Sequence, residues 1–180
     1  MRAWGLAALV ALAGCGGGGE GVFPVYRDTG VPIASKALFE PARYAGVWHE
    51  IARFPVAFEA GCTGVTAEYG LREDGLLSVL NTCRGPDGAV RSTIAGTAEV
   101  VGPGRLQVRF GAVPFVAADY WVLWVDEGYR TAVVGTPSGR AGWVLNRDPA
   151  IPADRWAAAL EILDFNGYDV SRLEVLGQVE

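Results

Sequence analysis

The feature that most constrains this chain is a series of eight short apolar segments with turn sequences between them and no helical pattern interrupting them. The segments span residues 44–54, 64–71, 76–83, 93–101, 105–110, 120–125, 130–135 and 142–147. Turn sequences such as Arg72-Glu73-Asp74-Gly75 separate neighbouring segments. Such an order predicts an all-β, eight-stranded antiparallel up-and-down barrel, which closes on itself and leaves no exposed edge. A barrel of about eight strands can enclose one small ligand.

A single convincing helical pattern follows the eight segments. Pro152 suits a first helical turn, and Trp156, Ala159, Leu160 and Leu163 recur at a spacing that places them on one apolar stripe. Asn166-Gly167 is expected to end the helix. The stripe needs a surface to cover, so we expect one C-terminal α-helix packed outside the barrel wall, followed by a last extended piece over 172–176.

The N-terminus has the layout of an export signal. Arg2 precedes an apolar run over 4–12, which is too short to cross a bilayer, since a span takes about 20 apolar residues. Leu12-Ala13-Gly14-Cys15 resembles the lipobox of bacterial lipoproteins, in which the cysteine receives a lipid and the preceding peptide is removed. We therefore predict a lipoprotein signal peptide over 1–14, a lipidated Cys15 with its tether and lead-in over 15–36, and the barrel domain over 37–180. An ordinary signal peptide with an incidental cysteine is the alternative.

The anchor and the charge indicate which partners to expect. A residue other than Asp, here Gly16, follows Cys15, and by the sorting habit of such lipoproteins this indicates the outer membrane, with the domain facing the periplasm. The formal net charge of -5 and the lack of clustered Lys and Arg disfavour nucleic acid. The sequence leaves open whether the chain is a monomer or a homodimer.

Three cysteines divide into one anchor and one pair. With Cys15 assigned to lipidation, Cys62 and Cys83 are left as a predicted disulfide in an oxidising compartment. Cys62 opens the second predicted strand and Cys83 closes the third, so both belong at the same end of the barrel. Counting pairs outward from the turn does not set them opposite one another without a bulge, and a redox-active role is the alternative. Two Cys and one His fall short of a zinc set, so neither a metal nor a cofactor is expected.

Three motifs carry a family resemblance. Gly46-Val47-Trp48 matches the lipocalin G-x-W motif, and the run over 44–54 is similar to bacterial outer-membrane lipocalins of the Blc type. The family's T-D-Y motif appears in weakened form around Asp126, and its closing arginine as Arg147. The resemblance covers 39–176 and implies a lipocalin barrel that binds a hydrophobic small molecule, with a fatty acid or lysophospholipid as the expected ligand.

Strand direction places these motifs together. If successive strands alternate in direction, the start of the first strand, the turn after the sixth and the end of the eighth lie at one closed end. Trp48, Asp126 and Arg147 would converge there, where the resemblance implies that Arg147 packs across the Trp48 ring as a cation-π contact. The loops at the other end would rim the mouth, with Phe58, Val113, Phe115 and Val116 as apolar groups.

Period-two alternation from an inward Trp48 predicts which side chains face the lumen. His49 and Arg53 would point outward. The expected cavity wall comprises Glu50, Ala52, Phe54, Ala67, Tyr69, Val79, Asn81, Gly96, Ala98, Tyr120 and Trp143. A carboxylate low in an apolar cavity is costly unless it is paired, so Glu50 should find a partner or have a raised pKa, as a structural group or as a ligand anchor.

The sequence thus favours a lipid-binding lipoprotein that serves storage, transport or membrane maintenance. The alternatives are a binding protein for another hydrophobic ligand, such as a pigment or a quinone-like molecule, and a filled barrel with a structural or interaction role. We expect no enzyme and no catalytic residue, because the sequence has no nucleophile elbow, no phosphate-binding loop and no metal-ligand spacing. The single histidine, His49, would face away from the lumen.

Overall fold

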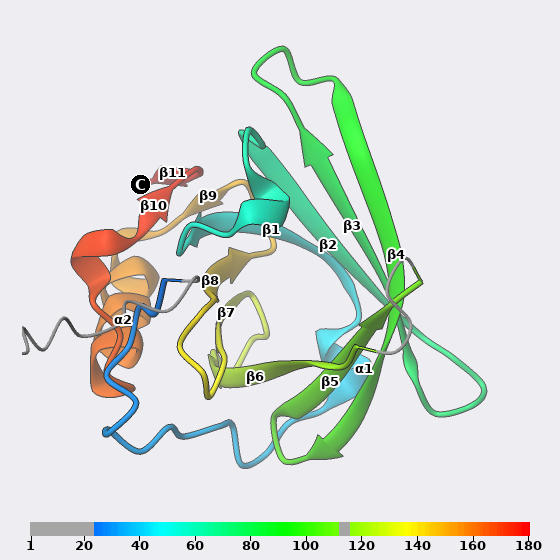
Figure 1. Ribbon diagram of the computed structural model, residues 1–180, viewed down its shortest axis with the longest axis horizontal. Helices are drawn as coiled ribbons and strands as arrows, with labels where there is room; N and C mark the ends of the chain where they lie inside the picture. The colour runs from blue at the N-terminus through cyan, green and yellow to red at the C-terminus, as the bar shows by residue number, and fades with distance from the viewer. Residues whose placement is uncertain (1–23, 112–115) are drawn as a thin grey trace, which may run out of the picture.

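Antiparallel pairing between successive strands builds the body of the protein. The computed structural model describes residues 24–111 and 116–180 (Figure 1). Each strand pairs with the next along the chain and β1 pairs with β8, which closes the predicted eight-stranded barrel. The strands are β1 Gly46–Arg53, β2 Gly64–Leu71, β3 Leu77–Arg84, β4 Val90–Gly102, β5 Arg105–Phe110, β6 Ala118–Val125, β7 Thr131–Gly135 and β8 Gly142–Asn146.

Short elements surround the barrel. They are α1 Pro41–Tyr44, η1 Ala57–Glu59, β9 Ala150–Ile151, α2 Ala153–Phe165, η2 Val170–Arg172, β10 Glu174–Val175 and β11 Gln178–Val179. β10 pairs with the end of β1, and β11 runs parallel to β9. No helix in 24–111 or 116–180 is long and apolar enough to cross a membrane.

The first strand starts later than the sequence predicted. Tyr44 was expected in that strand, but it ends α1, whose first turn begins with Pro41. Gly46 then has φ +99, a left-handed conformation that glycine adopts without strain, and the strand runs from there. The side chain of Tyr44 is therefore free to enter the lower end of the barrel, where it is fully buried.

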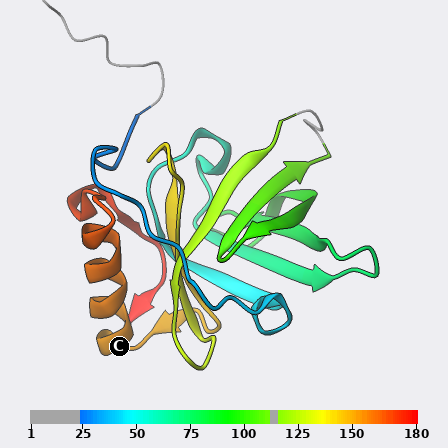
Figure 2. The same cartoon turned by 90° about the horizontal axis from the view of Figure 1, so that it is seen from below.

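Two apolar clusters lie on the two faces of the barrel wall. The inner cluster includes Tyr44, Trp48, Tyr69, Leu77, Val79, Ala98, Leu106, Val108, Val122, Val134 and Leu145. The outer cluster lies under α2, which packs outside the barrel against β6 and β7 as predicted (Figures 1 and 2). Ala159 and Leu163 of the predicted stripe are fully buried in it. The helix covers one side of the wall and leaves the lumen to other residues.

A bulge in β1 changes which of its residues face the lumen. Glu50 lies opposite Leu145 and Ala52 lies opposite Val144, so Ile51 is an extra residue on β1. Directly opposed residues on paired strands share a face of the sheet. Glu50 and Leu145 therefore face the lumen, whereas Ala52 and Val144 face the helix side.

The bulge overturns part of the predicted cavity wall. Ala52 and Phe54, predicted to face inward, belong to the outer cluster, where the Phe54 ring stacks on Tyr168 at 5.0 Å between centroids. Arg53, predicted to face outward, lies opposite Trp143 and is only 5% exposed. Period-two alternation fails here because one inserted residue reverses the faces of everything after it.

The lead-in from residue 24 onward packs along the barrel wall beside α2. Tyr26 is buried and stacks on Phe54 at 5.1 Å. Arg27 donates hydrogen bonds to the carbonyl oxygens of Pro137 and Asn166, both at 2.9 Å. These contacts fix the chain against the closed body before it reaches α1.

Candidate ligand-binding site

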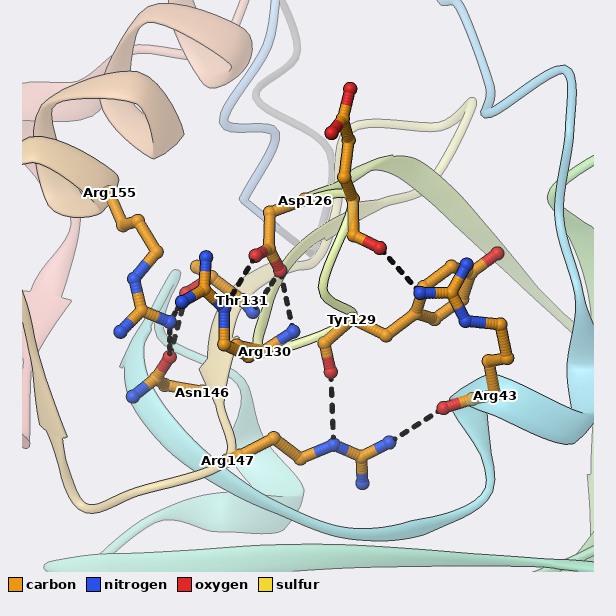
Figure 3. A network of polar contacts seen from close by, with 9 residues as sticks. Arg43, Asp126, Tyr129, Arg130, Thr131, Asn146, Arg147 and Arg155 are labelled. Atoms are coloured by element: carbon orange, nitrogen blue, oxygen red, sulfur yellow. Dashed lines mark hydrogen bonds and ion pairs between the residues drawn. The ribbon is translucent and has the colours of Figure 1, made fainter.

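Arg147 closes the base of the barrel. Its guanidinium lies 3.8 Å from the centre of the Trp48 ring, which is the contact that the sequence motifs implied. It also donates to the backbone oxygens of Val47 at 2.8 Å, Arg43 at 2.9 Å and Tyr129 at 3.2 Å, some of which are drawn in Figure 3. A Cβ on Gly46 would lie 3.2 Å from Nη1 of Arg147, so the guanidinium and the positive φ both favour glycine there.

Asp126 stabilises the β6–β7 turn, which contacts Arg147 at the closed end of the barrel. Its carboxylate accepts hydrogen bonds from the backbone N–H of Thr131 at 2.8 Å and from Nε of Arg130 at 3.0 Å (Figure 3). Burial raises the pKa of Asp126, but these hydrogen bonds outweigh burial and hold it below its ordinary value. The turn presents the carbonyl of Tyr129 to Arg147, so Asp126 positions a neighbour of Arg147.

Three tyrosine hydroxyls form a floor above the base. The hydroxyl of Tyr120 lies 2.8 Å from that of Tyr44 and accepts a hydrogen bond from Tyr69 at 2.9 Å. Burial raises the pKa of all three phenols, which keeps them neutral donors and acceptors. Because Tyr69 and Tyr120 project from opposite walls, they separate a filled lower lumen from an open upper one.

The upper lumen holds a cavity of about 170 Å³. Predicted residues in its wall are Glu50, Ala67, Tyr69, Val79, Asn81, Tyr120 and Trp143, together with the predicted mouth residue Phe58. The wall is mainly apolar, with a few polar groups near the mouth. An alkyl chain would therefore be bound by burial of apolar surface, and the polar groups would decide what its end can be.

Two predicted wall residues on β4 do not reach the cavity. Gly96 lies opposite the cavity residue Val79, but a Cβ there would lie 2.9 Å from the Phe110 ring, which covers the position. Ala98 is 1% exposed and packs in the filled lower lumen with Leu106. Both residues face the lumen as expected, but neighbouring side chains fill the lumen beside them.

Several wall residues were not predicted. They are Glu59, Val65, Val108, Phe110, Ala118, Asp119, Thr136, Ala141 and Leu145. Alternation could have found Leu145, which lies two residues after Trp143 on β8, and Val108 with Phe110 on β5. Glu59 belongs to η1, a loop element without a periodic pattern, so only the folded structure places it.

A buried ionic cluster lies beside the upper cavity. Nη1 of Arg53 is 3.3 Å from Glu50 and 3.6 Å from Glu59. Trp143 donates to Glu59 through Nε1 at 3.4 Å. Glu50 and Glu59 are 7% and 6% exposed as whole residues. Glu50 thus has the expected ionic partner. That partner is Arg53, which the sequence analysis predicted to face outward.

Burial and crowding of like charge act on both carboxyl groups. Burial, followed by the neighbouring Glu59, raises the pKa of Glu50 well above its ordinary value, and Arg53 offsets only part of this rise. Burial also raises the pKa of Glu59, against the hydrogen bond from Trp143. The two buried acids share one guanidinium, which also lies 3.5 Å from the exposed Glu174, so the cluster is short of positive charge when the acids are ionised.

The disulfide between Cys62 and Cys83 ties the loop that carries η1 to β3. The Cα atoms are 5.4 Å apart. Cys83 lies opposite Val65 in the β2–β3 ladder, so the two cysteines are not cross-strand partners. The bridge forms because Cys62 precedes β2 and lies in the loop, where it can reach across. Phe58 and Glu59 are thereby held at the mouth.

Other predicted groups lie elsewhere. His49 faces outward into a surface groove beside Arg84, and burial lowers its pKa. The described residues contain no group of three or more His, Cys, Asp or Glu side chains that could hold a metal ion. Cys15, Val113 and Phe115 lie outside the described residues.

Comparisons with known proteins agree with this architecture. The family described as the lipocalin-like domain matches residues 39–178. Outer membrane lipoprotein Blc of Escherichia coli strain K12 is 36% identical over 135 residues, covering 74% of this chain and 76% of that protein. Apolipoprotein D of Macaca fascicularis is 34% identical over 184 residues, covering 96% and 94%. Insecticyanin of the tobacco hornworm Manduca sexta, at 21% identity, has a TM-score of 0.65 over 85% of this chain and 86% of that one.

The barrel with a helix packed outside it therefore has the architecture of a known family. The family match spans most of the chain, and the sequence relatives exceed 30% identity over more than two thirds of it. This chain belongs to the lipocalin family.

Proposed function

We propose that this protein holds a single-chain amphiphile, such as a fatty acid or a lysophospholipid, with its alkyl chain in the upper lumen. The observation that carries the proposal is the apolar cavity, closed below by the tyrosine floor and reached from the mouth. Burial of alkyl groups stabilises such a complex by about 0.8 kcal/mol per CH₂. Storage, transport or membrane maintenance would follow from reversible uptake of such molecules.

The size of the cavity favours a slim ligand. Its volume of about 170 Å³ is below the range of about 300–1,000 Å³ that is usual for small-molecule pockets. One alkyl chain, or part of one, suits this space better than the fused or substituted rings of a pigment or a quinone. The polar end would then remain near the mouth, beside Glu50, Glu59 and Asn81.

We further infer that the chain is an outer-membrane lipoprotein anchored through Cys15 and facing the periplasm. The lipobox-like sequence before Cys15 supports this, as does the name of the bacterial relatives, Outer membrane lipoprotein Blc. Cys15→Ser should move the protein from the membrane fraction to the soluble periplasmic fraction. Retention of the variant in the membrane would refute anchoring through Cys15.

A filled barrel that acts as an interaction module is the second candidate. It is favoured by the contacts of Tyr120 with Tyr69 and Trp143, whose ring centroids lie 6.0 and 6.2 Å from its own. These rings meet across the lumen, which reduces the space above the floor. The two candidates differ in whether the purified protein carries a ligand.

Native mass spectrometry with lipid extraction separates them. The full-length chain with Cys15→Ser would be purified without detergent, so that no surfactant displaces a bound molecule. The proposal predicts a co-purifying amphiphile near one per chain, or stoichiometric uptake of an added one. A protein that is empty and also takes up no added amphiphile would favour the interaction module.

A further inference from the structure

The first described residues of the chain lie at the mouth end of the barrel. The backbone N–H of Tyr26 donates to the carbonyl of Gly139 at 2.7 Å. Gly139 belongs to the loop between β7 and β8, which lies at the mouth because β7 ends there and β8 begins there. Figure 2 shows the blue start of the described chain beside the yellow β7–β8 loop. The lead-in then runs along the wall to the closed base, where the N–H of Glu40 donates to the hydroxyl of Tyr129.

The length of the preceding segment limits where the proposed anchor can lie. Cys15 stands nine residues before Pro24, the first described residue. A fully extended chain spans at most about 3.3–3.6 Å per residue, so the anchor lies within about 30 Å of Pro24. The eight residues of β1 alone extend about 26 Å along the wall. A bilayer at the base would therefore require a nearly fully extended tether, whereas a bilayer at the mouth would not.

Two exposed phenylalanines lie at the mouth end. Phe58 is 68% exposed and Phe165 is 70% exposed, and no other phenylalanine in 24–111 or 116–180 is classed as exposed. Phe58 belongs to η1 at the mouth, and Phe165 is the last residue of α2. Large apolar side chains in water gain free energy when a lipid or protein surface covers them.

The lead-in joins the two elements that carry these rings. The hydroxyl of Tyr26 donates to the carbonyl of Pro55, just before η1, at 2.6 Å. Nε of Arg27 donates to the carbonyl of Asn166, directly after α2, at 2.9 Å. The start of the chain, the η1 loop and the C-terminal end of α2 therefore form one end of the molecule.

We propose that this end of the molecule rests on the bilayer that holds the Cys15 anchor, with Val25, Phe58 and Phe165 as its apolar contacts. We call these three residues the membrane face. Val25 is 43% exposed and lies closest to the tether. The inference rests on the proposed function, since it needs the anchor, and it adds an orientation in which the mouth opens toward lipid.

The orientation gives the cavity a route to its source of amphiphiles. Phe58 both lines the cavity and is exposed at the mouth. With the membrane face on the bilayer, an alkyl chain could pass from lipid into the upper lumen along this ring. It would then not have to cross the water between the bilayer and the barrel, where its exposed apolar surface is costly.

Charges near the end of α2 indicate an apolar contact rather than an electrostatic one. The exposed charged residues there are Asp164, Asp169 and Arg172. Two acids and one base give no net attraction for anionic lipids. We therefore expect docking on zwitterionic phosphatidylcholine and little loss of docking at high salt, which screens exposed charges but not apolar burial.

Fluorescence quenching tests the orientation on the anchored protein. The full-length lipidated chain would be reconstituted into phosphatidylcholine vesicles that contain a lipid with a nitroxide on its headgroup, which quenches nearby fluorophores. A fluorophore would be attached either at Ser138→Cys, in the β7–β8 loop, or at Leu71→Cys, at the base end of β2; both positions are exposed. We expect severalfold stronger quenching at position 138 than at position 71, with little change at high salt.

Variants then assign the contact to the membrane face. The double change Phe58→Ser with Phe165→Ser should lower quenching at position 138 to nearly the level at position 71, although the anchor remains. Phe165→Ser alone should act in the same direction and leave the affinity for an added amphiphile unchanged, because Phe165 is not part of the cavity wall. Leu38→Ser is the matched control. It removes an 83% exposed side chain just before α1 and should leave quenching at position 138 unchanged.

The outcomes separate this inference from the proposed function. Quenching at position 71 that equals or exceeds that at position 138 would overturn the orientation and leave the anchor and the cavity standing. Unchanged quenching at position 138 in the double variant would show that the tether alone sets the distance, which also overturns the inference. A lipidated chain that does not stay with the vesicles would refute the anchor together with the orientation. If the double variant does not fold, Phe165→Ser decides.

Discussion

At the scale of single residues, Arg147 makes several contacts that hold the closed end of the barrel together. It stacks on Trp48 and donates to carbonyl groups from the lead into β1 and from the β6–β7 turn. Replacing it by methionine keeps much of the hydrophobic stem but leaves these carbonyls without their donor. We expect Arg147→Met to lower the free energy of unfolding by about 2–4 kcal/mol, measured by urea denaturation.

Arg172 offers a matched control for that change. Its guanidinium also lies over an aromatic ring, that of Tyr26 at 4.4 Å, but it donates to one exposed carbonyl, that of Val25. Arg172→Met should cost less than about 1 kcal/mol. Equal losses from the two changes would mean that Arg147 contributes only its stacking contact.

Glu50 should make stability depend on pH. Burial and Glu59 raise its pKa in the folded protein above the ordinary value of 4.5. The folded state therefore binds this proton more tightly than the unfolded state, so stability is greatest below the ordinary pKa and falls as pH rises through the folded pKa. Glu50→Gln should flatten this part of the curve of unfolding free energy against pH.

Urea denaturation in steps from about pH 4 to pH 8 measures this effect. Some slope should remain in Glu50→Gln, because the pKa of Glu59 is also raised by burial. Glu68→Gln, outside the barrel, should keep the slope of the unaltered protein. If the curves of the unaltered protein and of Glu50→Gln run parallel, Glu50 does not carry the pH dependence.

Residue positions were predictable where a motif or an unbroken strand specified them. Motif order and strand direction predicted that Arg147 and Trp48 lie at the same end of the barrel, and the family resemblance implied the contact between them. Ala67, Tyr69, Val79 and Asn81 followed from alternation along β2 and β3, whose ladder has no irregularity. In β1 the extra residue Ile51 reverses which face of the sheet each later residue of the strand lies on. The sequence has no glycine or proline there that would have indicated a bulge.

At the scale of elements, the disulfide holds the η1 loop against β3. The loop it closes spans 21 residues, for which loop-closure entropy predicts about 3 kcal/mol of stabilisation. Replacing both cysteines by alanine should lower the free energy of unfolding by about that amount. It should also weaken decan-1-ol binding at least severalfold, because Phe58 and Glu59 lose their fixed position at the mouth.

Denaturation and calorimetry on the same samples separate the two effects. The unaltered protein treated with a reducing agent should behave like the double alanine variant. Lower stability with unchanged affinity would show that η1 reaches its position without the bridge.

Element types were easier to predict than their limits. The strands and the outer helix followed from apolar periodicity and turn residues, because those patterns reflect which faces are buried. Val90 to Ser92 extend β4 beyond its predicted start, although all three are exposed and they show no alternation of buried and exposed positions. They pair with the end of β3, so tertiary pairing lengthens the hairpin beyond what its own residues indicate.

At the scale of the whole molecule, closure of the sheet divides the lumen into a filled base and a small open cavity. Strand count and order predicted the barrel, because a chain of hairpins of this length has few other ways to avoid open edges. The volume of the cavity was not predictable. It depends on how far Tyr120, Phe110 and Trp143 extend across the lumen, which is set by side-chain packing between strands distant in sequence.

We propose above that this cavity holds the alkyl chain of the ligand. The most direct test is calorimetric titration of decan-1-ol into the Cys15→Ser chain with and without Ala67→Trp, a change that fills the lumen from the wall of β2. Ala95→Trp, on an exposed position of β4 outside the cavity wall, is the matched control. We expect one binding site per chain, which Ala67→Trp abolishes and Ala95→Trp retains, with both variants folded. Equal binding by the two folded variants would place the ligand outside the barrel and refute binding in the cavity.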